Sequence, residues 1–262
     1  GGGVCASKDH KHHHGAQDSA YQQDKLQAKF YEKSLSLGIL SRQPDAYYFH
    51  GGQHSPLGYS EQQFSLPRWT DLLVSRQGFL DDAYKLPVVM GWMFLPMKQY
   101  HAGGDAASFQ PYMKNLDSYK FALDQYLGAG CAMTFRGDAL YDVKGDESYN
   151  LVKNRVKWFK MHRDILSSDI IHLKRPTGQG IDAFLHVNSK LEHKALAMLF
   201  NPTDVNLSTL VTLPLYYTGL TDKLTINIGG EGESIMHLER DYSVSIHISL
   251  EAKSSTWVLV TE

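Results

Sequence analysis

The sequence predicts an α/β part at residues 1–167 followed by an all-β part at residues 168–262, with the boundary near Ser167 and Ser168. In the first part, apolar residues at helical spacing alternate with short apolar runs. In the second part, apolar and polar residues alternate at a period of two. We therefore expect part of a (β/α)8 TIM barrel, namely its C-terminal strands and helices, followed by an antiparallel β-sandwich.

Three helices are predicted in the first part. The first spans Ser19–Leu37, where its first residue and Gln22 form a capping box and Gly38 supplies a left-handed C-terminal turn. The second covers residues 109–127, because large apolar side chains recur there at three- and four-residue intervals. The third covers residues 149–166 for the same reason.

The strands are predicted from apolar runs and from alternation. Residues 88–94 are apolar without interruption, as expected of a parallel strand that is covered on both faces, and residues 131–135 form a shorter strand. Segment 66–84 fits either a helix or a strand. In the second part, the strand segments are residues 181–187, 194–200, 207–217, 222–229, 243–250 and 255–261.

The first part is too short for a complete barrel. An eight-fold barrel takes roughly 200–250 residues, and only 167 residues precede the predicted sandwich. The chain is then either an open α/β sheet or the C-terminal part of a barrel. The start on Gly1-Gly2-Gly3, which is typical of the middle of a loop, favours the second interpretation and predicts a fragment.

Composition excludes several classes of protein. The 262 residues contain 26 Lys plus Arg and 28 Asp plus Glu, a net charge of −2 without a basic block, so a nucleic-acid partner is not expected. No apolar run is long enough to cross a membrane, and two cysteines cannot form a disulfide framework. No cofactor and no particular partner protein is indicated. The sequence Asn206-Leu207-Ser208 would be compatible with secretion, but no targeting segment assigns a compartment.

Candidate functional residues follow the predicted strands, because α/β barrels carry their active sites at the strand ends. Paired carboxyl groups cleave glycosidic bonds, and aromatic faces cover sugar rings while cationic and polar groups bind the hydroxyls. The candidates are Asp45, Arg76, Asp81, Asp82, Trp92, Tyr100, His101, Arg136 and Asp138. The competing interpretations are that Asp81 and Asp82 lie in a solvated turn and that Trp92 is a core residue. Arg136 and Asp138 could equally form a structural ion pair.

The run from His10 to His14 contains the residue type that most often binds zinc. Residues three or four apart in this run would face together only on a helix, and the run precedes the predicted helix start. We therefore expect no metal here, and instead hydrogen bonding to a polar ligand or plain exposure. A nucleophilic role for Cys5 has no support from spacing.

Long motifs resemble a family of uncharacterised α-galactosidase-like proteins related to the melibiase-type glycoside hydrolases. The resemblance spans nearly the whole chain. Its first half rests on Val4-Cys5-Ala6-Ser7 with His10 and His13, Asp18-Ser19, Gly58-Tyr59, Ser65-Leu66-Pro67-Arg68, Arg76-Gln77 with Asp81, Met90-Gly91-Trp92-Met93-Phe94, Tyr100-His101, Gly103-Gly104, Arg136-Gly137 and Tyr141-Asp142. Its second half rests on Asp169-Ile170-Ile171-His172, His186-Val187-Asn188, Asn201-Pro202-Thr203-Asp204 and Pro214 to Leu220.

The resemblance implies a barrel followed by a sandwich and a retaining, α-galactosidase-type mechanism on a carbohydrate substrate. The matching nucleophile would lie before Gly1, so the chain alone is predicted to be inactive. Asp81 is the candidate acid/base, and Asp82 and Asp45 are the alternatives. The implied substrate-binding residues are Cys5, His10, His13, Arg76, Trp92, Tyr100, His101, Arg136 and Asp138.

Two other functions stay open. A non-catalytic carbohydrate-binding protein would keep the aromatic and cationic residues but would not need a tuned acid at Asp81. A structural or adhesion module would work through residues 168–262 alone, with no sugar contact near Asp81. A pH–activity profile separates the enzyme from the binding protein.

Overall fold

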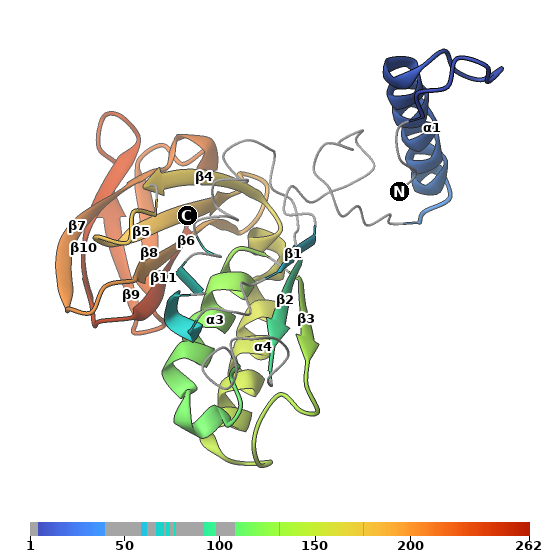
Figure 1. Cartoon of the computed structure of the whole chain (residues 1–262). Helices are drawn as coiled ribbons and strands as arrows, with labels where there is room; N and C mark the ends of the chain where they lie inside the picture. Colours follow the sequence, from blue (N-terminus) through green and yellow to red (C-terminus); the bar gives the residue numbers. More distant parts are fainter. Residues whose placement is uncertain are drawn as a thin grey trace. The chain divides into compact units, whose positions relative to one another are not determined.

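A computed structural model describes residues 5–39, 59–61, 67–70, 72–73, 76, 92–97, 108–130, 132–174 and 176–262 (Figure 1). The chain divides into two compact units, Gly1–His54 and Ser55–Glu262, and each is described by itself. Within the described ranges, no helix is both long enough and apolar enough to cross a bilayer.

The described residues of the first unit, 5–39, contain the helix α1 over Ala16–Ser36. The predicted start at Ser19 is wrong. The helix begins three residues earlier because Gly15, at φ 91°, turns the chain into it and because Asp18 accepts the backbone amide of His14 at 2.6 Å. The hydroxyl of Ser19 instead accepts the amide of Cys5 at 3.1 Å. Gly38 follows the helix at φ 73°, as the sequence predicts.

The second unit opens with a parallel sheet of order β1-β2-β3, formed by Tyr59–Glu61, Trp92–Pro96 and Ala132–Arg136. The strands pair parallel, with Glu61 beside Phe94 and Pro96 beside Arg136. The two strands predicted from the apolar runs are therefore present and parallel, although β2 extends to Pro96 and residues 88–91 lie outside the described part of the chain.

Helices lie between and after these strands. The predicted helix at 109–127 divides into a short 3-10 turn, η3 (Tyr112–Lys114), and the helix α3 (Leu116–Gly128). The break is at Asn115, whose side chain donates to the carbonyls of Phe109 and Pro111. The next helix, α4 (Glu147–Leu166), begins two residues before the prediction because Asp146 caps it.

Six strands form an antiparallel sheet of order β4-β5-β6-β11-β8-β9. A second sheet pairs β7 with β10, also antiparallel. The six predicted strand segments are all present, and β4 and β9 are additional. The bounds are β4 Asp169–Lys174, β5 Asp182–Val187, β6 His193–Asn201, β7 Leu207–Pro214, β8 Lys223–Ile228, β9 Glu233–His237, β10 Ser243–Leu250 and β11 Ser254–Thr261.

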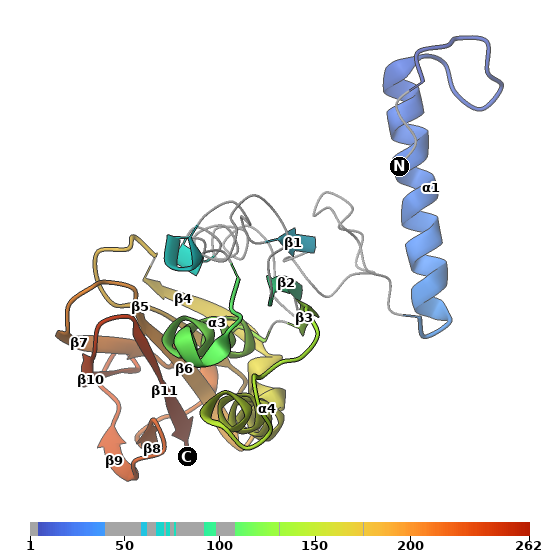
Figure 2. The same ribbon diagram turned by 60° about the horizontal axis from the view of Figure 1, so that its bottom comes forward.

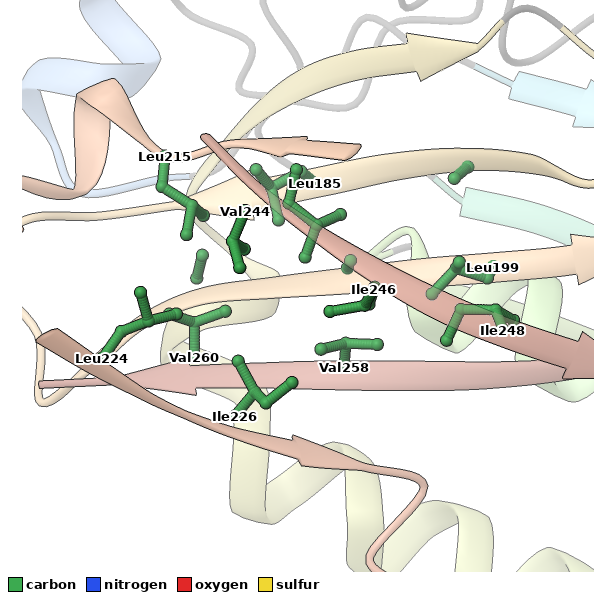
Figure 3. Close-up of a cluster of buried hydrophobic side chains, with 14 of the residues drawn as sticks. Leu185, Leu199, Leu215, Leu224, Ile226, Val244, Ile246, Ile248, Val258 and Val260 are labelled. Atoms are coloured by element: carbon green, nitrogen blue, oxygen red, sulfur yellow. The ribbon is translucent and has the colours of Figure 1, made fainter. Parts of the chain in front are cut away.

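The strands β5 and β6 of the six-stranded sheet are buried almost throughout, on both faces. Along β6, Leu196, Met198 and Phe200 belong to one core with α3 and α4, which lie on that side of the sheet (Figure 2). The alternate residues Ala195, Ala197 and Leu199 belong to a second core with the strands β7 and β10 (Figure 3). This explains why β6 is almost continuously apolar.

The predicted strand at 207–217 ends early. It stops at Pro214, which cannot donate to a ladder, and a 3-10 turn, η4 (Tyr216–Thr218), follows. Tyr216 and Tyr217, in this turn, are 64% and 66% exposed.

The described helical residues at Arg68–Thr70, 72–73 and 76 indicate that this part of the ambiguous segment is helix.

Candidate functional site

The ends of β2 and β3 meet at one edge of the parallel sheet. Arg136, the last residue of β3, pairs with Pro96, the last residue of β2. Just beyond, a Cβ on Gly137 would lie 2.5 Å from the Cβ of Met97. Only glycine therefore allows the segments that follow β3 and β2 to approach so closely. The exposed Asp138 follows directly. Two of the predicted substrate-binding residues therefore stand at the carboxyl end of a parallel strand.

The loop that carries Asp138 is held by two buried tyrosines. The Tyr112 hydroxyl donates to the carbonyl of Ala139 at 2.5 Å, and the Tyr119 hydroxyl donates to that of Leu140 at 3.1 Å. Burial raises the pKa of both phenols well above the usual range, so both remain protonated donors. The loop is therefore fixed to η3 and α3.

Asp142 fastens the same loop from its other end. Its two carboxylate oxygens accept the backbone amides of Tyr112, at 3.1 Å, and of Met113, at 2.8 Å. The backbone amide of Asp142 donates to the hydroxyl of Ser148 at 2.9 Å. The Tyr141-Asp142 part of the family-like motif thus has a structural role, which is to set the position of the loop after β3.

Arg76 is buried rather than open to a pocket. Its side chain is 1% exposed and ion-paired with Asp182 at the start of β5. Its guanidinium carbon also lies 3.8 Å above the ring centroid of Phe200. The guanidinium of Arg76 is therefore paired and packed inside the second unit, so in this structure Arg76 has a structural role.

Cys5, His10 and His13 come together in the first unit. The Cys5 Sγ lies 3.6 Å from His10 Nδ1, which lies 3.3 Å from His13 Nε2. The expectation that His10 and His13 would meet only on a helix is wrong, because a turn at Lys11 and His12 brings them together before α1 begins. Burial, together with the neighbouring His10 and His12, lowers the pKa of His13.

Sequence reasoning missed a polar group in a small cavity of about 190 Å³ between α3, α4 and β11. Here Asp124 pairs with Arg155 and accepts the Ser255 hydroxyl at 2.7 Å. Burial raises the pKa of Asp124, and Arg155 and Ser255 oppose that shift. Trp158 and Trp257 line the same cavity. The available signal was a carboxylate within the apolar stripe of α3.

The remaining predicted site residues are only partly described. Trp92 and Arg136 are placed by their backbone in β2 and β3. The three carboxylates Asp45, Asp81 and Asp82, together with Tyr100 and His101, lie outside the described residues. Their roles therefore stay predictions.

Comparison with known proteins shows the fold. No protein-family model and no curated protein sequence matches the chain. A debranching enzyme of Nostoc punctiforme superimposes with a TM-score of 0.51 at 12% identity, over 90% of this chain and 54% of that one. An α-amylase of Geobacillus thermoleovorans gives 0.49 at 12%, over 91% and 57%. A GH36 α-galactosidase of Geobacillus stearothermophilus gives 0.43 at 18%, over 72% and 24%.

The chain thus spans about half the length of the first two of these proteins, 54% and 57%. At such low identity the likeness concerns the fold alone. The chain has the mixed helices and antiparallel C-terminal strands of glycoside hydrolase structures.

Proposed function

We propose that the protein acts on carbohydrate as a retaining glycoside hydrolase of the α-galactosidase type. The observation that carries the proposal is the superposition on the debranching enzyme over 90% of the chain, and that enzyme was soaked with acarbose, a carbohydrate ligand. The choice of α-galactosidase type rests on the sequence motifs rather than on the superposition. The proposed reaction is cleavage of a glycosidic bond.

The loop after β3 supports a sugar-binding role. Arg136 and Asp138 supply a cation and a carboxylate at the end of a parallel strand, the position where barrel enzymes bind substrate. The buried donors Tyr112 and Tyr119 hold that loop, so Asp138 is presented from a fixed backbone. A pre-positioned carboxylate binds a sugar hydroxyl without first losing conformational freedom.

The proposal gives the remaining residues the roles that the resemblance implies. The strands β1, β2 and β3 belong to a (β/α)8 barrel, and residues 168–262 form a sandwich domain packed against it. Asp81 is the acid/base, with Asp82 and Asp45 as alternatives. The substrate contacts come from Trp92, Tyr100, His101, Arg136 and Asp138.

The nucleophile is proposed to lie before Gly1 in the whole protein. The covalent step of retention needs that group. We accordingly propose that the 262-residue chain binds a sugar without hydrolysing it.

Binding and hydrolysis test these points separately. Calorimetric titration of the 262-residue chain with raffinose and with acarbose should detect binding, which Asp138→Asn weakens. Asp164→Asn, the same change at an exposed position on α4, should leave it intact. In a form extended at its N-terminus, hydrolysis of an aryl α-galactoside should be lost in Asp81→Asn while binding is kept.

Several outcomes would contradict the proposal. Binding of neither sugar by either form removes the carbohydrate function. Binding without hydrolysis by the extended form, unchanged in Asp81→Asn, identifies a non-catalytic carbohydrate-binding protein instead. Rapid hydrolysis by the 262-residue chain itself would show that the nucleophile lies within it. Loss of activity in Asp82→Asn but not in Asp81→Asn transfers the acid/base role to the neighbouring carboxylate.

A further inference from the structure

Three strong metal-ligating atoms converge in the loop that precedes α1. The Cys5 Sγ, a ring nitrogen of His10 and a ring nitrogen of His13 all lie within 4.8 Å of one another. The side chain of His13 is buried at 4% exposure, whereas His10 is exposed and Cys5 is half-buried. The group therefore sits at the surface with one ligand anchored inside the loop.

Two of the three separations match the edges of a tetrahedral zinc site, and the third, between Cys5 Sγ and the His13 nitrogen, is within 4.8 Å. With Zn–S near 2.3 Å and Zn–N near 2.0–2.1 Å, tetrahedral angles place a sulfur about 3.6 Å from a nitrogen and two nitrogens about 3.3 Å apart. The observed distances are 3.6 Å from Cys5 Sγ to His10 Nδ1 and 3.3 Å from His10 Nδ1 to His13 Nε2. His10 Nδ1 thus lies at a tetrahedral edge length from both of the other ligand atoms.

Hydrogen bonding alone accounts poorly for this convergence. A neutral imidazole nitrogen offers either one N–H or one lone pair. His10 Nδ1 faces both the sulfur of Cys5 and a nitrogen of His13, so these two groups compete for the same hydrogen or the same lone pair. A cation removes the competition, because all three atoms can direct a lone pair at it.

The surrounding backbone is organised to hold the three ligands. The amide of Cys5 donates to the Ser19 hydroxyl on α1 at 3.1 Å. The amide of Gly15 closes the loop onto the carbonyl of Ser7 at 3.0 Å. These two hydrogen bonds hold the backbone of the loop that carries the three ligands. The loop is thus tied at both ends to the start of the helix.

From this geometry we propose that Cys5, His10 and His13 bind a transition-metal ion, with Zn²⁺ the ion that fits best. One thiolate and two imidazoles are ligands that zinc prefers, while calcium and magnesium prefer oxygen. Three protein ligands leave a fourth coordination position. His12, whose ring lies 4.7 Å from that of His13 between centroids, is the nearest further imidazole. This inference lies within the first unit and does not depend on the carbohydrate function.

The test is a metal titration of the full 262-residue chain under reducing conditions. Zn²⁺, competed with a chromophoric chelator, should bind with one-to-one stoichiometry. Co²⁺ should give the thiolate-to-metal absorption of a cysteine-ligated site. Cys5→Ser should abolish that absorption and weaken Zn²⁺ binding by at least about 100-fold. Even the loss of a group that only hydrogen-bonds a metal ligand weakens binding by about 10–100-fold.

Matched variants separate a built site from loose binding to a histidine-rich run. His10→Gln removes an exposed ligand and should weaken Zn²⁺ binding like Cys5→Ser, whereas His14→Gln, a neighbouring exposed histidine outside the group, should not. Cys131→Ser removes the other cysteine and should keep the Co²⁺ absorption. Circular dichroism of each variant establishes that α1 is still formed.

The proposal is overturned by three results. The first is the absence of stoichiometric Zn²⁺ binding. The second is equal weakening in His10→Gln and His14→Gln, which would indicate diffuse binding to the run. The third is a Co²⁺ spectrum without thiolate absorption, together with fast alkylation of Cys5 that Zn²⁺ does not slow. That last result would point instead to a thiol activated by His10.

Discussion

Arg76 and Asp182 form a buried, bidentate ion pair between segments that are 106 residues apart in the sequence. The Arg76 guanidinium donates from Nε to one carboxylate oxygen at 3.2 Å and from Nη2 to the other, and the two side chains are 1% and 2% exposed. Asp182 and Phe200 are partners across β5 and β6, so neighbouring strands supply the carboxylate and the ring that Arg76 contacts. The pair therefore anchors the helical segment around Arg76 to the six-stranded sheet.

Removing one partner of this pair should strongly destabilise the second unit. Asp182→Ala leaves a buried guanidinium without its anion, and such losses cost about 3–5 kcal/mol. We expect urea unfolding to shift to lower concentration by the corresponding amount. The double variant Arg76→Met with Asp182→Leu should recover much of the loss, because it removes both charges and leaves apolar volume.

An exposed pair serves as the control for that cycle. Asp222 and His237 contact at 3.0 Å, with side chains 71% and 62% exposed. Asp222→Asn should change the free energy of unfolding by less than about 1 kcal/mol. If Asp182→Ala were as mild as Asp222→Asn, the buried pair would not hold the segment to the sheet.

The contrast between Arg76 and the strands shows which features the sequence could predict. Strand and helix periodicities are local, so the parallel strands β2 and β3 and the alternation in β10 were predictable. The partner of Arg76 was not, because nothing local relates it to Asp182.

The predicted boundaries of the helix at 109–127 were wrong for a similar reason, namely a contact between residues distant in the sequence. Asn115, which breaks the predicted helix at 109–127, is bound by Arg68 from 47 residues away. The grouping of Cys5 with His10 and His13 depends on a turn rather than on a period, and no spacing rule encodes that turn.

Acid should destabilise the second unit through His186. This side chain is fully buried and contacts the carbonyl of Gly128 at 2.7 Å through Nε2. Burial lowers the pKa of His186 to about 4, below its value of 6.5 in the unfolded chain. As the pH decreases, the unfolded state therefore binds the proton before the folded state does. The contribution of His186 to the free energy of unfolding is fully present above about pH 6.5 and is lost as the pH decreases toward 4. Between pH 7 and pH 5 the loss should be about 2 kcal/mol.

The matching variant is His186→Gln, which can still donate to Gly128 but cannot take up a proton. Its free energy of unfolding should depend less on pH over this range than that of the original chain, whatever its stability at pH 7. A residual slope is expected from His162, whose pKa is likewise lowered to about 4 by burial. An unchanged slope in His186→Gln would exclude His186 as a source of the acid sensitivity.

Two glycines with the same backbone angle should respond differently to alanine. Gly130 and Gly178 both have φ of 74°, a conformation that costs other residues about 1–2 kcal/mol. A Cβ at Gly130 would lie 2.2 Å from the carbonyl oxygen of Leu166 at the end of α4, whereas one at Gly178 would meet no described atom within 4 Å. We expect Gly178→Ala to cost only the backbone penalty.

Gly130→Ala should cost clearly more, about 3 kcal/mol or above, because a backbone oxygen must also move. Thermal unfolding of the two variants measures the difference. At about 2–4 °C per kcal/mol for a unit of this size, the melting temperatures should separate by several degrees. Equal shifts in melting temperature would mean that the ends of α3 and α4 move apart without a measurable cost.

The loop after β3 should loosen when its two tyrosine hydroxyls are removed. Tyr112→Phe and Tyr119→Phe keep the buried rings and delete only the hydrogen bonds to the carbonyls of Ala139 and Leu140. Each loss should cost about 0.5–1.5 kcal/mol. Amide hydrogen exchange of residues 138–142 should accelerate in both, while Tyr217→Phe, at an exposed tyrosine, should leave it unchanged.

The same pair of variants bears on the carbohydrate site. If Asp138 contacts the sugar, a looser loop must be reordered on binding, and the ordering entropy lowers the affinity. Raffinose should then bind more weakly to the double variant than to the original chain, with unchanged stoichiometry. Faster exchange of residues 138–142 with unchanged affinity would instead separate this loop from the binding site, and the sugar contacts would have to come from the other strand ends.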